Sequence, residues 1–139
     1  MKIHLKRNEK LFLNGAVIRL DRRGSIELMN NAQFLLENHI MQPEEATTPL
    51  RQIYFITQTM LMDPANAHLI MFLFQSYVTG LKAAIVDPVC LANISKAQNL
   101  VESNDYYGAL KILRLTFHES KKNKAIDRNP DNKLSEKAA

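Results

Sequence analysis

A change of hydrophobic period near Gln42-Pro43 constrains the fold of this chain more than any other feature. Before it, apolar and polar residues alternate, as in a half-buried strand, so that Ile3 and Leu5 are expected on one face of the first strand. After it, apolar residues recur at helical spacing. The sequence therefore predicts an α+β protein, in which an N-terminal antiparallel β-meander of four or five short strands precedes four helices.

Two turn signals divide the strand-rich segment. Asn14-Gly15 lies between two apolar runs and favours a two-residue hairpin turn. Arg22-Arg23-Gly24 is expected to form a three-residue loop with Gly24 in the left-handed region. This loop predicts a hairpin in which Arg19 faces Glu27 as a cross-strand ion pair. The same register pairs Leu20 with Ile26 and Ile18 with Leu28 on one face.

Capping residues followed by proline mark three helix starts, at Thr48-Pro49, Asp63-Pro64 and Asp87-Pro88. Asn104 or Asp105 is expected to cap a fourth helix. The expected helices span about 49–62, 64–85, 88–103 and 105–121. The second is apolar nearly all round, which predicts that it is the most buried element or lies in an oligomer interface.

The predicted organisation has three parts: a β-meander at 1–41, a helical region at 42–121, and a basic, disordered tail at 122–139, where apolar content falls sharply. No secretory leader is recognised. The longest apolar run is also far shorter than the roughly 20 residues of a membrane-spanning helix. We therefore expect a cytoplasmic protein that does not associate with membranes.

The residues do not predict an enzyme. The four histidines are scattered without metal-ligand spacing, and the four glycines are isolated, so that no phosphate-binding loop is formed. Cys90 lies close after a predicted helix start, where a thiol can be activated, but its place on an apolar stripe favours a packing role. No catalytic residue, metal or cofactor is expected.

Positive charge is concentrated toward the N-terminus and in the tail. Residues 1–40 hold seven Lys or Arg against four Asp or Glu, whereas residues 41–118 hold five against six. A solvated basic face explains this as well as a polyanion partner does, on charge alone. If the partner is RNA, cations near the turns would contact phosphates and an exposed imidazole could stack on a base. The candidate RNA-binding residues are His4, Lys6, Arg7, Lys10, Arg22 and Arg23.

The same segment carries a family resemblance. KIHLKRNEKLFLNGAVIRLDRRGSIELMNNAQFLLENHIM, followed by QPEEATTPLRQIYFITQTMLMDP, resembles the flagellum biosynthesis repressor FlbT family, with the likeness reaching about residue 118. The resemblance implies a cytoplasmic bacterial regulator that acts on the 5′ untranslated region of flagellin mRNA, in cooperation with FlaF and with flagellin. Family members are described as repressors or as positive regulators, so the resemblance does not give the sign of the effect.

Two further interpretations remain open. LKRNEKLFLNGAVIRL is also similar, within a stretch of about forty residues, to the CsrA family of mRNA-binding proteins. Alternatively, the helical half is a protein-binding module or chaperone for flagellin or a regulatory partner, with methionines giving an adaptable groove or simply filling the core. The strand at 2–6 would be an open edge, which allows a homo-oligomer.

Overall fold

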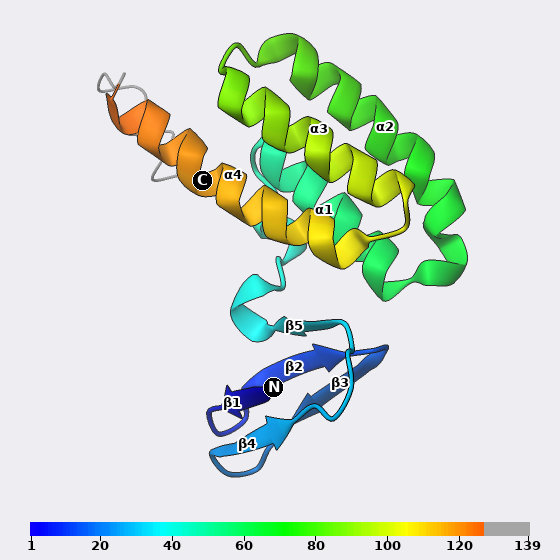
Figure 1. The fold of residues 1–139 in the computed structure, drawn as a ribbon, viewed down its shortest axis with the longest axis vertical. Coiled ribbons are helices and arrows are strands. Elements are labelled where there is room, and N and C mark those ends of the chain that lie inside the picture. The colour runs from blue at the N-terminus through cyan, green and yellow to red at the C-terminus, as the bar shows by residue number, and fades with distance from the viewer. Residues whose placement is uncertain (127–139) are drawn as a thin grey trace. The chain divides into compact units, whose positions relative to one another are not determined.

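The computed structural model describes the backbone of residues 1–126 and the side chains of residues 1–117. The chain forms two compact units (Figure 1). The first, Met1–Ile40, holds all the described strands and is called the β unit; the second begins at Met41 and is called the helical unit. Within residues 1–126, five antiparallel strands followed by four α-helices confirm the predicted α+β class.

The β unit contains two small antiparallel sheets. One pairs β1 with β4, and the other has the order β3-β2-β5. The strands are β1 (Lys2–Leu5), β2 (Lys10–Leu13), β3 (Ala16–Arg19), β4 (Gly24–Glu27) and β5 (Phe34–Leu36). The core of the unit is built on buried Ile3, Leu5 and Leu11. Partly buried side chains from both sheets pack against these three: Leu13, Ile18, Leu20, Ile26, Leu28, Phe34 and Leu36.

The Asn14-Gly15 turn is confirmed. It joins β2 to β3, with Leu13 opposite Ala16. The φ angles of Asn14 and Gly15 are 48° and 93°, both in the left-handed region that a two-residue hairpin requires. The dipeptide predicted this turn correctly because asparagine and glycine both tolerate a positive φ.

The second predicted hairpin is wrong. β3 pairs with β2, and β4 pairs with β1, so the segment between β3 and β4 crosses from one sheet to the other. Arg19 therefore faces Lys10, Glu27 faces Lys2, and Gly24 begins β4 without a positive φ. The observed pairing gives β1 a partner and creates a second layer, which lets both sheets bury their apolar faces against each other.

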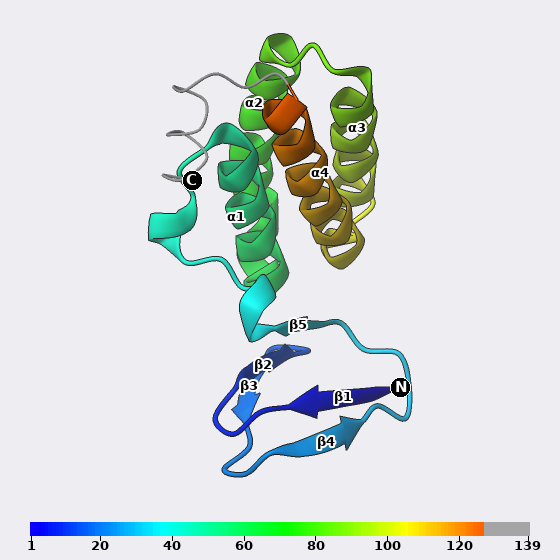
Figure 2. The same ribbon diagram turned by 90° about the vertical axis from the view of Figure 1, so that its left-hand side faces the viewer.

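The helical unit contains α1 (Pro49–Met62), α2 (Ala67–Ala84), α3 (Pro88–Glu102) and α4 (Tyr106–Ile126), shown from two sides in Figures 1 and 2. α4 continues beyond the expected end at Lys121. Three short 3-10 helices occur in the described chain: η1 (Glu37–His39), η2 (Pro43–Glu45) and η3 (Pro64–Asn66). The expected disordered tail at 122–139 begins inside α4, and its residues 127–139 lie outside the described part of the chain.

Side-chain caps explain most of the helix starts. Thr48 Oγ1 accepts from the Arg51 N–H at 3.2 Å, and an Asp87 oxygen accepts from the Val89 N–H at 3.3 Å. The Gly108 N–H donates to Asp105 at 2.9 Å. Asp63 does not cap as expected: its carboxylate accepts from the Asn66 side chain, and the chain forms η3 before α2 begins. Proline at a first helical position therefore marked a 3-10 turn here.

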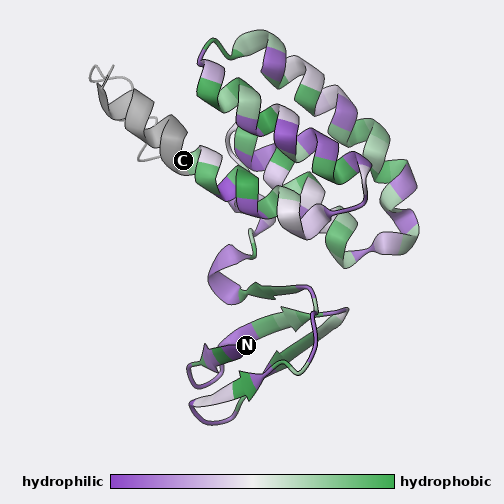
Figure 3. Ribbon diagram, viewed as in Figure 1, coloured by the Kyte–Doolittle hydropathy of each residue, from purple (hydrophilic) through white to green (hydrophobic). Residues whose placement is uncertain are grey.

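The expectation that α2 is the most buried element is wrong within the chain. Its buried side chains are Ala67, Phe74, Val78 and Leu81, whereas Phe72 is 81% exposed. α2 packs mainly against α1, while α3 and α4 pack most extensively against each other. The described residues therefore leave one face of α2 uncovered, although hydrophobic residues continue along the helix (Figure 3). The oligomer alternative stays a prediction.

Among the described residues, no helix combines the length and apolar character needed to cross a bilayer. The expected packing stripe of α3 is confirmed, because Cys90, Ile94, Ala97 and Val101 are all buried.

Candidate nucleic-acid interface

The turn between β1 and β2 exposes two of the predicted cations. The Lys6 N–H donates to a Glu9 carboxylate oxygen at 2.9 Å, and the Glu9 N–H returns to the Lys6 carbonyl at 3.1 Å. Asn8 has a φ of 63°, which asparagine tolerates better than most residues. This tight turn leaves the side chains of Lys6 and Arg7 exposed.

The segment between β3 and β4 brings Arg22 and Arg23 to the same end of the β unit. The Asn8 N–H donates to the Leu20 carbonyl at 2.8 Å, which joins the β1–β2 turn to the start of this segment. Leu5, the last residue of β1, pairs with Gly24, the first residue of β4. The two basic turns consequently lie side by side (Figure 2).

Lys10 and Arg19 form a cross-strand pair of like charges. They lie directly opposite each other where β2 begins and β3 ends, and both are exposed. Like charges at facing positions destabilise a sheet by up to about 1 kcal/mol. The fold itself gains nothing from this arrangement, whereas an anion placed between the two cations would remove the repulsion.

Six cations thus gather at one end of the β unit, and we call this surface the basic end. It comprises Lys6, Arg7, Lys10, Arg19, Arg22 and Arg23. Its carboxylates are Asp21 and Glu9, and Glu9 already accepts the Lys6 N–H. Within residues 1–117, none of the six cationic side chains is hydrogen-bonded or ion-paired to another residue. The potential at this end is therefore positive and accessible to an anionic ligand.

Arg19 is the residue that sequence reasoning missed as a site residue. The hairpin predicted for β3 and β4 assigned it to Glu27, but the real register places it beside Lys10. The sequence did contain a signal for this position of Arg19. A two-residue turn at Asn14-Gly15 is enough to place residues 10 and 19 opposite each other.

His4 lies next to the basic end, on the exposed face of β1. Its ring Nδ1 is 2.8 Å from the Ser25 hydroxyl on β4, which orients the imidazole on the sheet surface. Ile3 and Leu5 point to the core instead, as the alternation predicted. Phe12, the other ring of the first two strands, is buried and does not offer a stacking surface.

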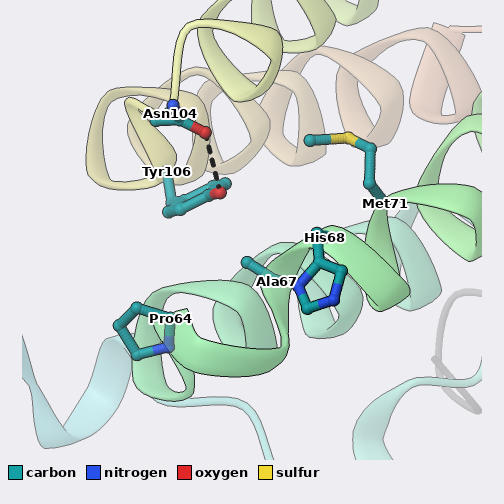
Figure 4. Close-up of a pocket in the computed structure, with 6 residues that line it drawn as sticks. All are labelled: Pro64, Ala67, His68, Met71, Asn104 and Tyr106. Carbon is teal, nitrogen blue, oxygen red and sulfur yellow. Dashed lines mark hydrogen bonds between the residues drawn. The ribbon is translucent and has the colours of Figure 1, made fainter.

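A separate pocket of about 540 Å³ lies in the helical unit, between the start of α2 and the α3–α4 connection (Figure 4). Its one hydrogen bond between lining residues joins the Tyr106 hydroxyl, as donor, to Asn104 Oδ1 at 3.1 Å. The lining residues are Pro64, Ala67, His68, Met71, Asn104 and Tyr106. The lining holds no lysine or arginine, so the pocket lacks the phosphate-contacting chemistry of the basic end.

The fold and the basic end together define a small α+β protein with a candidate polyanion-binding surface. Comparison with known families identifies it further: the model of the flagellar protein FlbT family matches residues 1–122. The chain belongs to the FlbT family, as the sequence resemblance predicted.

Curated relatives in several bacteria carry the name probable flagellum biosynthesis repressor protein FlbT. The one from Mesorhizobium japonicum is 44% identical over 117 residues, which cover 84% of this chain and 80% of the relative. The one from Agrobacterium fabrum is 42% identical over 114 residues, covering 82% and 76%. These names describe regulators of flagellum synthesis. No solved structure matches the chain.

Proposed function

We propose that this protein regulates flagellin synthesis in the cytoplasm by binding the 5′ untranslated region of flagellin mRNA through its basic end, and so affects translation or decay of the message. The name of its relatives supports a regulatory role in flagellum synthesis. The observation that carries the RNA contact is the convergence of six cations from four separate strand ends on one small surface.

The electrostatics favour a polyanion over a single anionic group. The cations come from two turns and one cross-strand pair, so they form an extended surface rather than a closed cradle. Phosphates repeated along an RNA strand can meet such a surface at several points, and each contact releases counterions. Affinity should therefore depend steeply on salt.

His4 supplies the element that distinguishes bases. Sequence-specific RNA readers stack unpaired bases on aromatic or imidazole rings. The His4 ring is exposed and is positioned by the Ser25 hydroxyl beside the basic end. We expect His4→Ala to change the preference among single-stranded leader sequences while leaving the salt dependence unchanged.

The test is direct binding of the purified full chain to a labelled flagellin leader across a series of salt concentrations. For single strands, the log–log slope falls by about 0.7 for each phosphate contact that is lost. Arg22→Glu combined with Arg23→Glu should therefore flatten the slope by up to about 1.4 and weaken binding at low salt. Both residues are exposed in a turn, so the fold should be retained.

A matched control makes the same change of formal charge elsewhere. Lys96→Glu combined with Lys111→Glu alters exposed cations of α3 and α4. This variant should retain the parent slope, apart from a small long-range effect at low salt. If the arginine reversal binds as tightly as the parent at every salt concentration, the basic end is not the RNA surface.

A further inference from the structure

One face of α2 is exposed, apolar and uncharged along the length of the helix. Its members recur at spacings of three and four residues, and we call them the α2 stripe: Leu69, Phe72, Leu73, Ser76, Tyr77, Gly80, Ala83 and Ala84. The one formally charged residue of α2, Lys82, donates its Nζ to Gln98 on α3 at 2.6 Å. The stripe therefore offers no charge to solvent or to a polyanion.

The two halves of the stripe differ in size. Leu69, Phe72 and Leu73 are 61%, 81% and 48% exposed and form large projections in the first half. The second half carries the small residues Gly80, Ala83 and Ala84, so no large side chain projects from it. Ser76 and Tyr77 lie at the midpoint. A helix with projections at one end and a hollow at the other is complementary to an inverted copy of itself.

Nothing in the described part of the chain explains why position 80 is a glycine. A Cβ built at this position meets no atom of the described residues within 4 Å, so packing among those residues does not require glycine. Glycine inside a helix is about 1 kcal/mol less favourable than alanine. Its φ is not positive, so backbone conformation does not require it either. What glycine does provide is close approach from outside the chain.

We propose that the α2 stripe is a homodimer interface, in which α2 packs antiparallel against α2 of a second copy about a two-fold axis near Ser76 and Tyr77. This arrangement places Leu73 of each copy over Gly80 of the other and Leu69 over Ala84. An isologous interface needs one surface that is complementary to itself, and the size gradient along the stripe meets that requirement.

The exposed area suits a modest dimer. With about 200 Å² for each large side chain, Leu69, Phe72, Leu73 and Tyr77 present on the order of 400 Å² in one copy. The small residues and backbone between them add to this, so a pair buries on the order of 1,000 Å², the lower bound for a specific interface. The dimer does not depend on the RNA proposal, because the stripe holds none of the cations of the basic end.

The first test measures the mass of the full chain in solution by light scattering and sedimentation between about 1 and 100 µM, the range expected for a small interface. The parent chain should dimerise. Phe72→Glu should raise the dimer dissociation constant at least about thirtyfold, as removal of a central apolar contact does. Gly80→Leu should do the same by filling the hollow, while open space around Gly80 leaves the monomer fold unstrained.

The control is Asn99→Leu, which adds the same side chain at an exposed position on α3. It should leave the dissociation constant unchanged. A parent chain that remains monomeric at 100 µM would overturn the proposal. So would a dimer that survives both α2 variants, because it would use another surface such as the open edges of the β1–β4 sheet.

Disulfide trapping tests the antiparallel arrangement. Ser76→Cys lies near the two-fold axis, so the two copies should cross-link to each other under mild oxidation. Leu69→Cys lies about 15 residues from its equivalent, or about 22 Å along the helix axis, and should not cross-link. Efficient cross-linking of Leu69→Cys, or none at Ser76→Cys, would contradict the proposed geometry. The parent chain, whose native Cys90 is buried, measures the background level of cross-linking.

Discussion

The basic end of the β unit and the α2 stripe are both exposed, yet their chemistry is opposite. The basic end places Lys10 against Arg19 and adds four more cations from two turns. The α2 stripe carries no charge and exposes Phe72, Leu69 and Leu73 instead. A polyanion fits the first surface and would gain nothing from the second, whereas an apolar partner fits only the second.

Both surfaces contain local costs that the fold does not explain. Facing like charges weaken the β2–β3 pairing, and Gly80 weakens α2 without relieving a close contact with any residue that the structure describes. Natural sequences are locally consistent except where function demands otherwise. This difference supports the two proposals, in which the β unit contacts RNA and the helical unit associates with a second copy.

The largest expected effect separates two phenylalanines on α2. Phe74 is fully buried, so Phe74→Ala should lower the free energy of unfolding by about 3–5 kcal/mol. Phe72→Ala, two residues away and 81% exposed, should cost under about 1 kcal/mol in the dilute monomer. Urea denaturation at low protein concentration measures both. Equal losses would mean that the exposed face of α2 is covered within the chain.

The next effect concerns the start of the helical unit. The buried Gln58 accepts the Met41 N–H at 2.7 Å and donates to the Met41 carbonyl at 2.9 Å. Gln58→Leu would leave both backbone groups of Met41 without this partner, and we expect a loss of about 1–3 kcal/mol. Gln52→Leu on the same helix, where no such clamp exists, is the control. Thermal unfolding that fails to separate the two variants would contradict this role.

A smaller, pH-dependent effect is expected at Tyr54. Burial raises the pKa of this phenol above its usual value near 10, although the hydrogen bond and charge of Arg114 oppose the shift. The contribution of the neutral Tyr54 phenol to the free energy of unfolding is therefore complete below pH 10. It is lost as the pH rises further, because Tyr54 ionises first in the unfolded chain. Tyr54→Phe should cost about 1–2 kcal/mol at pH 7 through loss of the Arg114 bond.

The alkaline comparison of these two proteins provides the check. The stability gap between parent and Tyr54→Phe should narrow above pH 10, since phenylalanine does not ionise, while the lysines titrate equally in both. Denaturant titrations at pH 7 and above pH 10 measure the gap. A gap that widens with pH would show that the pKa of Tyr54 is lowered instead.

The smallest effect on stability is also the most specific to the basic end. Arg19→Gln removes one member of the facing cation pair, so it should raise the free energy of unfolding by up to about 0.5 kcal/mol. The same change should weaken leader RNA binding and flatten its salt dependence by about 0.7. Arg19→Gln should therefore raise the free energy of unfolding and at the same time weaken RNA binding. Lys96→Gln, the control on α3, should not show this combination.

Local signals predicted the elements well. Asn14-Gly15 gave the β2–β3 hairpin, and capping residues with proline gave the starts of α1 and α3. Strand pairing could not be predicted in the same way. β4 could pair with β3 or with β1, and the observed pairing with β1 is the one that buries the apolar faces of both sheets. Long-range contacts decide between these pairings, and the turn between β3 and β4 does not.

The same limit applies to the candidate site. The sequence indicated His4 and five of the cations, but only the register brings them together and adds Arg19. The apolar residues of α2 suggested that the whole helix is buried. This was wrong because composition does not reveal which side of a helix its neighbours cover. In the structure, α2 packs mainly against α1, and the α2 stripe is left exposed.

Under the proposed function, RNA contact is confined to the basic end. Backbone amide NMR of the full chain, titrated with a flagellin leader fragment, tests this confinement because every described residue except the prolines carries its own amide signal. We expect the largest amide shifts in residues 4–10 and 19–24, with residues 69–84 unchanged. Shifts concentrated on the helical unit, with residues 4–10 and 19–24 unaffected at saturation, would contradict it.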